Sequence, residues 1–257
     1  MLLWCRLEQM NSMEHSTMND SFHSSFSPTD SKLSANGPIV LPALLLCDFG
    51  HLDDEIRRLE VAGAKAMHLD VMDGLFVPQL TYGLVVVEAV RRAATVPIEV
   101  HMMVERPDDS AIQYAKAGAD IVTLHIERLA KTEETLAAIE ATGAQAHLAI
   151  SPGTPVSHVE PFLDSCSGVL VMSVEPGFGG QAFQSSAIEK IQKLQEIRTS
   201  TGRNFHIGVD GGISTKTIAS VAHAGADLIV AGSAILRQTD YADALRELED
   251  LARKSKG

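Results

Sequence analysis

The chain has few cysteines, a deficit of positive charge and no long apolar run. Its three cysteines among 257 residues, Cys5, Cys47 and Cys166, lie far apart and form no CxxC pair. This spacing favours neither a disulfide framework nor a cysteine zinc site, and it fits a reducing, cytoplasmic environment. Lysine and arginine number 21 against 33 aspartates and glutamates, for a formal net charge of -12. We therefore expect neither nucleic acid nor a membrane as a partner.

Periodicity is missing from the first 37 residues. Residues 1–37 are rich in Ser, Met, Asn and His and follow the pattern of neither a helix nor a strand, so we expect a disordered N-terminal extension. The apolar run at residues 2–4 is too short for a signal peptide. With 45% hydrophobic residues overall, the rest is long enough for one large domain, and we place a single catalytic domain at residues 38–257.

Two kinds of segment alternate from Ile39 onward. Short β-branched or leucine-rich runs predict strands at 39–46, 66–70, 98–103, 121–125, 145–150, 169–173, 206–209 and 228–231. Amphipathic patterns predict helices at 52–62, 84–93, 110–117, 131–142, 186–199, 215–224 and 240–254. Three of these helices end in an Ala-Gly-Ala step, in which Gly63, Gly118 and Gly225 are expected to cap the helix.

The eight predicted strands, each followed by a connecting segment, indicate an α/β fold of the (β/α)8 or TIM barrel type. A doubly wound sheet would need fewer strands or a longer chain. In a barrel, the carboxyl ends of all the strands meet at one face, and barrel enzymes have their active sites at that face. We therefore expect the functional residues where the predicted strands end.

Histidines and aspartates gather at these strand ends. His68 and Asp70 are two residues apart and share one face of a strand. His101 ends the next strand, and Asp210 ends the seventh. One histidine at a strand end is ordinary, but two histidines and two aspartates at one barrel mouth are a credible ligand set for Zn, Mn or Fe. The sequence therefore predicts a metal site made of these four side chains.

Three glycine-rich stretches also follow strands. They are Gly177-Phe178-Gly179-Gly180, Gly211-Gly212 and Gly232-Ser233. Glycine lets backbone N–H groups approach phosphate oxygens, and the loops after strands seven and eight of barrel enzymes frequently bind phosphate. A single cluster would indicate a tight turn, whereas three favour a phosphate site. The strand-end methionines Met72, Met103 and Met172 are either ordinary core residues or apolar groups that keep water from the metal.

These residues belong to longer motifs that resemble the ribulose-phosphate 3-epimerase family. The resemblance runs from about Pro38 to Ala252 and is carried by HLDVMDG at 68–74, FVP at 76–78, VHMMV at 100–104, MSVEPGFGGQ at 172–181, VDGG at 209–212 and AGS at 231–233. It implies a metal-dependent isomerase of the pentose phosphate pathway. Such an enzyme epimerises C3 of D-ribulose 5-phosphate to give D-xylulose 5-phosphate.

The resemblance also implies roles for single residues. One divalent ion (Zn, Fe, Mn or Co) would be bound by His68, Asp70, His101 and Asp210. Asp70 and Asp210 would be the catalytic acid/base pair. The substrate would contact His101, Gly177, Phe178, Gly179, Gly180, Gly211, Gly212, Gly232, Ser233, Met72, Met103 and Met172. As partners we expect the small-molecule sugar phosphate and further copies of the chain in a homo-oligomer.

Some positions depart from the family pattern. Ala43 stands where the family usually has a serine that touches the substrate, and further departures are Leu46-Cys47, Leu75, Gln79 and Ser151. None of them is a metal ligand or a catalytic carboxylate, so they bear on substrate identity more than on reaction type. Two alternatives stay open. One is an epimerase for a longer ketose phosphate such as allulose 6-phosphate, and the other is a catalytically silent paralogue that binds a sugar phosphate.

Overall fold

The structure, a computed structural model, describes Leu33 and residues 37–255. The disordered extension expected at residues 1–37 therefore lies almost wholly outside the described residues, and it stays a prediction. The same holds for the exact limits of the catalytic domain.

Eight parallel strands form one sheet that curves into a barrel, in the order β1-β8-β7-β6-β5-β4-β3-β2. The strands are β1 (Ile39–Pro42), β2 (Met67–Met72), β3 (Ile98–Met103), β4 (Ile121–His125), β5 (Gln145–Ile150), β6 (Gly168–Met172), β7 (His206–Asp210) and β8 (Leu228–Ala231). A parallel bridge between Ala43 and His68 joins the β1 and β2 edges and closes the barrel. The expected (β/α)8 fold is therefore confirmed.

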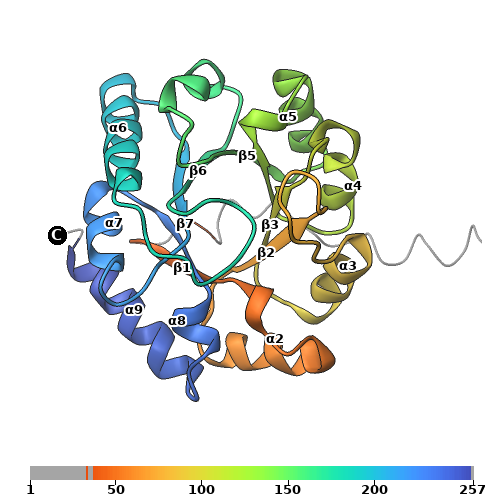
Figure 1. Ribbon diagram of the computed structural model, residues 1–257, viewed down its shortest axis with the longest axis vertical. Coiled ribbons are helices and arrows are strands. Elements are labelled where there is room, and N and C mark those ends of the chain that lie inside the picture. The colour runs from red at the N-terminus through yellow and green to blue at the C-terminus, as the bar shows by residue number, and fades with distance from the viewer. Residues whose placement is uncertain (1–32, 34–36, 256–257) are drawn as a thin grey trace, which may run out of the picture.

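Helices form a ring around the strands (Figure 1). They are α2 (Leu52–Val61), α3 (Leu84–Ala93), α4 (Ala111–Lys116), α5 (Thr132–Glu140), α6 (Ser186–Thr201), α7 (Ile218–Ala224), α8 (Ser233–Leu236) and α9 (Tyr241–Ser255). After β5, two 3-10 turns, η6 (Val156–His158) and η7 (Glu160–Phe162), replace a helix. Pro161 would lie inside a helix that began at Val156, and it cannot donate the backbone hydrogen bond that a helix interior needs. Among the described residues, none of the helices has both the length and the apolar character to cross a membrane.

Two strand ends differ from the sequence prediction by more than one residue. β1 ends at Pro42 instead of Leu46, and η2 (Leu44–Leu46) is a 3-10 turn. Pro42 pairs with Ala231, the last residue of β8, so a longer β1 would have no partner on that side. β2 instead continues past Asp70 to Met72, because its neighbour β3 continues to Met103 and pairs with it over the whole length. The length of the neighbouring strand therefore sets where each strand ends.

The expected glycine caps are present. Gly63, Gly118 and Gly225 have φ angles of 101°, 106° and 119°, and each follows a helix. L-residues with a side chain rarely adopt such angles, so glycine is the residue that can end these helices and turn the chain toward the next strand.

The barrel interior has an apolar floor at the amino ends of the strands. Ile39, Ile121 and Leu228, the first residues of their strands, belong to a buried cluster there together with Leu170. Leu33 belongs to the same cluster and is 5% exposed. The chain therefore contacts the barrel floor before its first strand begins.

His147 is a buried histidine inside the barrel, next to the backbone of Gly168. A Cβ at position 168 would lie 2.6 to 2.8 Å from three atoms of the His147 ring, so the ring occupies the space that a side chain there would fill. Within the described part, Nε2 of this ring has no hydrogen-bond partner. Burial lowers the pKa of His147 to about 3, and the native protein therefore holds this ring in its neutral form.

This burial predicts a pH-dependent stability. Between the ordinary histidine pKa near 6.5 and about 3, the unfolded chain binds a proton at His147 that the native chain does not. The free energy of unfolding should therefore fall as the pH falls through this window, by up to about 1.4 kcal/mol per pH unit. Urea unfolding of His147→Met between pH 7 and pH 4 should show a shallower pH slope than wild type. A slope equal to that of wild type, or to that of a control His158→Gln at an exposed site, would contradict this assignment.

Candidate active site

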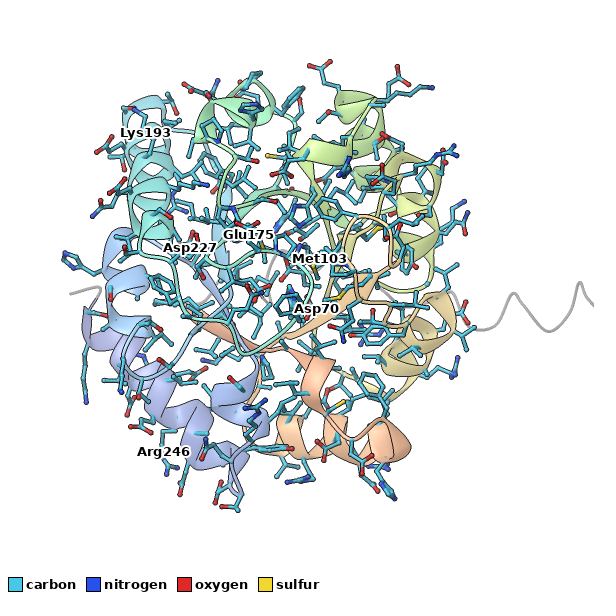
Figure 2. The ribbon with its side chains drawn as sticks, viewed as in Figure 1. Asp70, Met103, Glu175, Lys193, Asp227 and Arg246 are labelled. Carbon is cyan, nitrogen blue, oxygen red and sulfur yellow. The ribbon has the colours of Figure 1, made fainter. Side chains whose placement is uncertain are left out.

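A pocket opens at the carboxyl ends of the strands. Figure 2 places Asp70 and Met103 near the centre of the barrel, whereas Lys193 and Arg246 lie on the outer helices. The predicted site residues that line the pocket are Asp70, Met72, Met103, Met172, Gly177, Phe178, Gly179, Gly180, Asp210, Gly211, Gly212, Gly232 and Ser233. The predicted His68 and His101 do not line it, because both are fully buried behind the two carboxylates.

Four side chains from three strands converge below this pocket. His68 and Asp70 come from β2, His101 from β3 and Asp210 from β7, and one donor atom of each lies within 4.8 Å of all the others. Nε2 of His68 is 3.1 Å from Oδ1 of Asp70 and 3.9 Å from Oδ2 of Asp210. Nδ1 of His101 is 3.3 Å and 3.8 Å from the same two oxygens. The structure therefore brings all four predicted metal ligands together.

The donor set fits a divalent ion. Nδ1 of His101 is buried and, within the described residues, makes no hydrogen bond, although it lies near two carboxylates. A buried polar atom without a partner is costly, and a metal ion between the two imidazoles and the two carboxylates would satisfy it. Two imidazole nitrogens and two carboxylate oxygens are ligands that Zn, Fe, Mn or Co accept.

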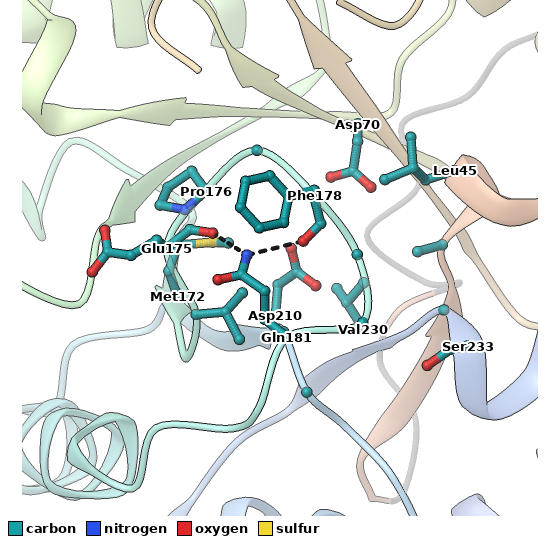
Figure 3. A pocket seen from close by; sticks show the side chains of 18 of the residues that line it. Leu45, Asp70, Met172, Glu175, Pro176, Phe178, Gln181, Asp210, Val230 and Ser233 are labelled. Atoms are coloured by element: carbon teal, nitrogen blue, oxygen red, sulfur yellow. Dashed lines mark hydrogen bonds between the residues drawn. The ribbon is translucent and has the colours of Figure 1, made fainter. Parts of the chain in front are cut away.

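The two aspartates differ in their protonation. Burial alone would raise the pKa of Asp70, but the neighbouring His68 and His101 outweigh it, and the pKa lies well below its usual range. Burial raises the pKa of Asp210 to about 6, and the negative charge of Asp70 adds to this increase although His68 opposes it. The pocket therefore holds one ionised carboxylate and one that can carry a proton near neutral pH. Figure 3 shows the two side chains pointing toward one another.

The loop after β2 is held by side-chain hydrogen bonds. Asp73 accepts from the backbone N–H groups of Leu75, Phe76 and Glu105, with distances of 2.8, 3.0 and 2.8 Å. Thr81 Oγ1 donates to the carbonyl of Asp70 at 2.7 Å. This loop therefore fixes the backbone that carries the Asp70 carboxylate.

The loop after β6 closes on itself beside the pocket (Figure 3). The side-chain amide of Gln181 donates to the carbonyls of Glu175 and Phe178, at 2.7 and 2.9 Å. Gly212 has a φ of 59°, and a Cβ there would lie 2.7 Å from the backbone of Phe183. A side chain at 212 would collide with that backbone, so the loop after β7 can pack this closely against the loop after β6 only with glycine at 212.

Several residues at the site were not singled out by the sequence patterns. Gln181 is one, and its contacts depend on how the loop folds. Glu99 and Glu127 are two others, and they hydrogen-bond to histidines behind the pocket. The available signal for Glu99 was its period-two spacing from His101, which puts a carboxylate inside an apolar strand. His125 lies between Glu127 and His101 and contacts both. Burial lowers the pKa of His125 to about 4, so its ring is neutral.

The positions at which the sequence departs from the family pattern fall in two groups. Ala43 and Leu46 line the pocket, whereas Leu75, Gln79 and Ser151 do not. Substitutions at the first two positions can therefore alter contacts with a ligand directly.

Comparisons with known proteins agree on one family. A family model described as "Ribulose-phosphate 3 epimerase family" matches residues 39–236. Ribulose-phosphate 3-epimerase of Bacillus subtilis is 42% identical over 210 residues, covering 81% of this chain and 97% of the relative. The chloroplastic ribulose-5-phosphate-3-epimerase of Arabidopsis thaliana is 40% identical over 220 residues, covering 85% and 78%. KGPDC from Streptococcus mutans, solved in a ligand complex, shares the fold with a TM-score of 0.69 at 18% identity, covering 86% and 99%.

Proposed function

Because this chain belongs to the ribulose-phosphate 3-epimerase family and is an epimerase, we propose that it interconverts D-ribulose 5-phosphate and D-xylulose 5-phosphate. The observation that carries this proposal is the pair of carboxylates, Asp70 and Asp210, that enter one pocket from β2 and β7. The reaction belongs to the pentose phosphate pathway. Cys47 and Cys166 are buried and form no disulfide, which supports a reducing compartment such as the cytoplasm.

Epimerisation at C3 needs a proton acceptor on one face of the carbon and a proton donor on the other. Asp70 is ionised and takes the C3 proton in the direction from ribulose to xylulose. Asp210, which enters the pocket from β7, delivers a proton to the opposite face. The roles exchange in the reverse direction. A side chain that cannot bind and release a proton at either position would leave one face without proton transfer.

The four converging side chains, His68, Asp70, His101 and Asp210, would hold one divalent ion, Zn, Fe, Mn or Co. When bound, the ion supplies charge stabilisation for the oxygen that becomes negative when the neighbouring carbon loses its proton. The protein orients the two carboxylates around it and keeps both imidazoles away from water.

The glycine-rich loops would bind the phosphate, and the methionines would exclude water. Gly177–Gly180, Gly211, Gly212, Gly232 and Ser233 line the pocket on the side of β6, β7 and β8. Backbone N–H groups in such loops bind phosphate without a positive side chain. Met72 and Met103 pack with Val77 at the pocket, and they would present an apolar surface to the sugar. A homo-oligomer is part of the same proposal.

The expected substrate preference is testable with the purified protein. Ribulose 5-phosphate should be turned over and allulose 6-phosphate much more slowly, because the Gly179-Gly180, Gly211-Gly212 and Gly232-Ser233 pairs that line the pocket favour a pentulose phosphate. Treatment with a chelator should reduce turnover to background, and Zn, Fe, Mn or Co should restore it. Coupled assays of both sugars, before and after chelation, measure this.

Two outcomes would contradict the proposal. Faster turnover of allulose 6-phosphate would mean that Ala43 and Leu46 admit the longer ketose. Binding of either sugar with no turnover at any metal concentration would identify a silent sugar-phosphate-binding protein.

A further inference from the structure

We propose that Glu99 and the pair His125–Glu127 are positioning residues that determine which ring nitrogen each metal-site histidine presents to the ion. The inference rests on the proposed function, because it concerns the same metal site. It adds a role for three residues that lie outside the ligand set and do not line the pocket.

His68 presents Nε2 because Glu99 occupies its other nitrogen. Nδ1 of His68 lies 2.9 Å from Oε2 of Glu99, and both side chains are buried. An ionised carboxylate only accepts hydrogen bonds, so Nδ1 must carry the hydrogen. Nε2, 3.1 Å from Asp70, is then the nitrogen left to face the two carboxylates and the position of the ion. Thr123 donates to the other oxygen of Glu99 at 2.6 Å and holds it in place.

His101 presents the opposite nitrogen, Nδ1, and a longer chain of hydrogen bonds determines this. Nδ1 of His125 lies 3.1 Å from Oε2 of Glu127 and donates its hydrogen to that oxygen, which leaves Nε2 of His125 bare. Nε2 of His101 lies 2.9 Å from that bare nitrogen and must therefore donate to it. Nδ1 of His101 is then free of hydrogen and, within the described chain, has no hydrogen-bond partner.

Both chains of hydrogen bonds end at anchored carboxylates. Glu127 also accepts from the backbone N–H of Ser151 at 2.8 Å and from the hydroxyl of Thr154. The Phe76 ring packs on His125 with 4.8 Å between ring centroids. The two nitrogens left for the ion, Nε2 of His68 and Nδ1 of His101, thus converge on Asp70 and Asp210. The wrong tautomer of either ring would direct an N–H at the position of the ion.

The tautomers can be measured in the zinc-bound protein. In ¹⁵N NMR spectra of the imidazoles of the zinc-bound wild type at neutral pH, we expect His68 and His125 to carry hydrogen on Nδ1 and His101 on Nε2. In Glu99→Met only His68 should lose this assignment, and in Glu127→Met the change should reach His125 and His101. A wild type in which His68 is protonated on Nε2, or His101 on Nδ1, would overturn the inference.

Metal affinity gives the second measurement, by competition with a chelator. Glu99→Met and Glu127→Met should bind Zn about 10- to 100-fold more weakly than wild type. Glu99→Gln keeps an oxygen that accepts from Nδ1, so it should recover most of this loss. Glu140→Met is the control, because Glu140 also accepts two hydrogen bonds, from Ala146 N and Ser167 Oγ, but lies outside both chains.

The outcomes separate this inference from the proposed function. A purely structural role for Glu99 would lower the melting temperature of Glu99→Met and leave its zinc affinity at the level of wild type, which overturns the inference alone. A wild type that binds no ion contradicts the proposed metal site and this inference together. Weaker binding in Glu99→Met, with recovery in Glu99→Gln and none lost in Glu140→Met, supports it.

Discussion

Asp70→Asn and Asp210→Asn are each expected to lower kcat for epimerisation by about 100- to 10,000-fold, the range that a positioned acid or base contributes. The amide keeps the shape of the side chain and an oxygen that can face the ion, but it cannot accept the C3 proton. Asp70 and Asp210 enter the pocket from different strands, so neither can replace the other. Steady-state assays with ribulose 5-phosphate at saturating metal measure the loss.

The control for this pair is Asp164→Asn. Asp164 is an exposed carboxylate that pairs with Arg203 away from the pocket, and its loss should leave kcat within about twofold of wild type. If both Asn variants at the pocket epimerise at the rate of the control, the two-carboxylate mechanism is wrong.

His68→Ala and His101→Ala should lose the metal together with the activity. Each substitution removes one of the four metal-ligand side chains. Loss of a residue that only hydrogen-bonds to a ligand costs about 10- to 100-fold in metal affinity, and loss of the ligand itself should cost more. The barrel should remain folded, because the apolar contacts of the strands with the surrounding helices do not involve these rings. Metal content by elemental analysis and folding by circular dichroism are the two measurements.

His223→Ala is the matched control, because His223 is an exposed histidine on α7. It should retain one metal per chain and full turnover. Stoichiometric metal and full activity in either His68→Ala or His101→Ala would remove these histidines from the ligand set.

The sequence could predict the barrel and the membership of the site because both follow from local patterns. His68, Asp70 and Met72 alternate with apolar residues, and this spacing places them on the inner face at the end of a strand. The rule that strand ends meet at one face then joins His101 and Asp210 to them. None of this requires knowledge of side-chain contacts.

Features that depend on neighbours far away in the chain could not be predicted. The end of β1 follows from the end of β8, which is distant in sequence. The contact of His68 with Glu99 follows from the register of β2 against β3, in which these two residues are partners. Leu33 is a single apolar residue in a polar stretch, and without periodicity it carries no sign that it is buried.

Transfer of deuterium from solvent to C3 tests the two-carboxylate account most directly. Wild type is allowed to convert ribulose 5-phosphate that has ordinary hydrogen at C3, in deuterated water. The xylulose 5-phosphate formed early is analysed by mass spectrometry and NMR. Because Asp70 removes the proton and Asp210 delivers another, the product should carry solvent deuterium at C3 from the first turnover. Product that quantitatively retains the substrate's own C3 hydrogen would contradict the assignment of two separate carboxylates.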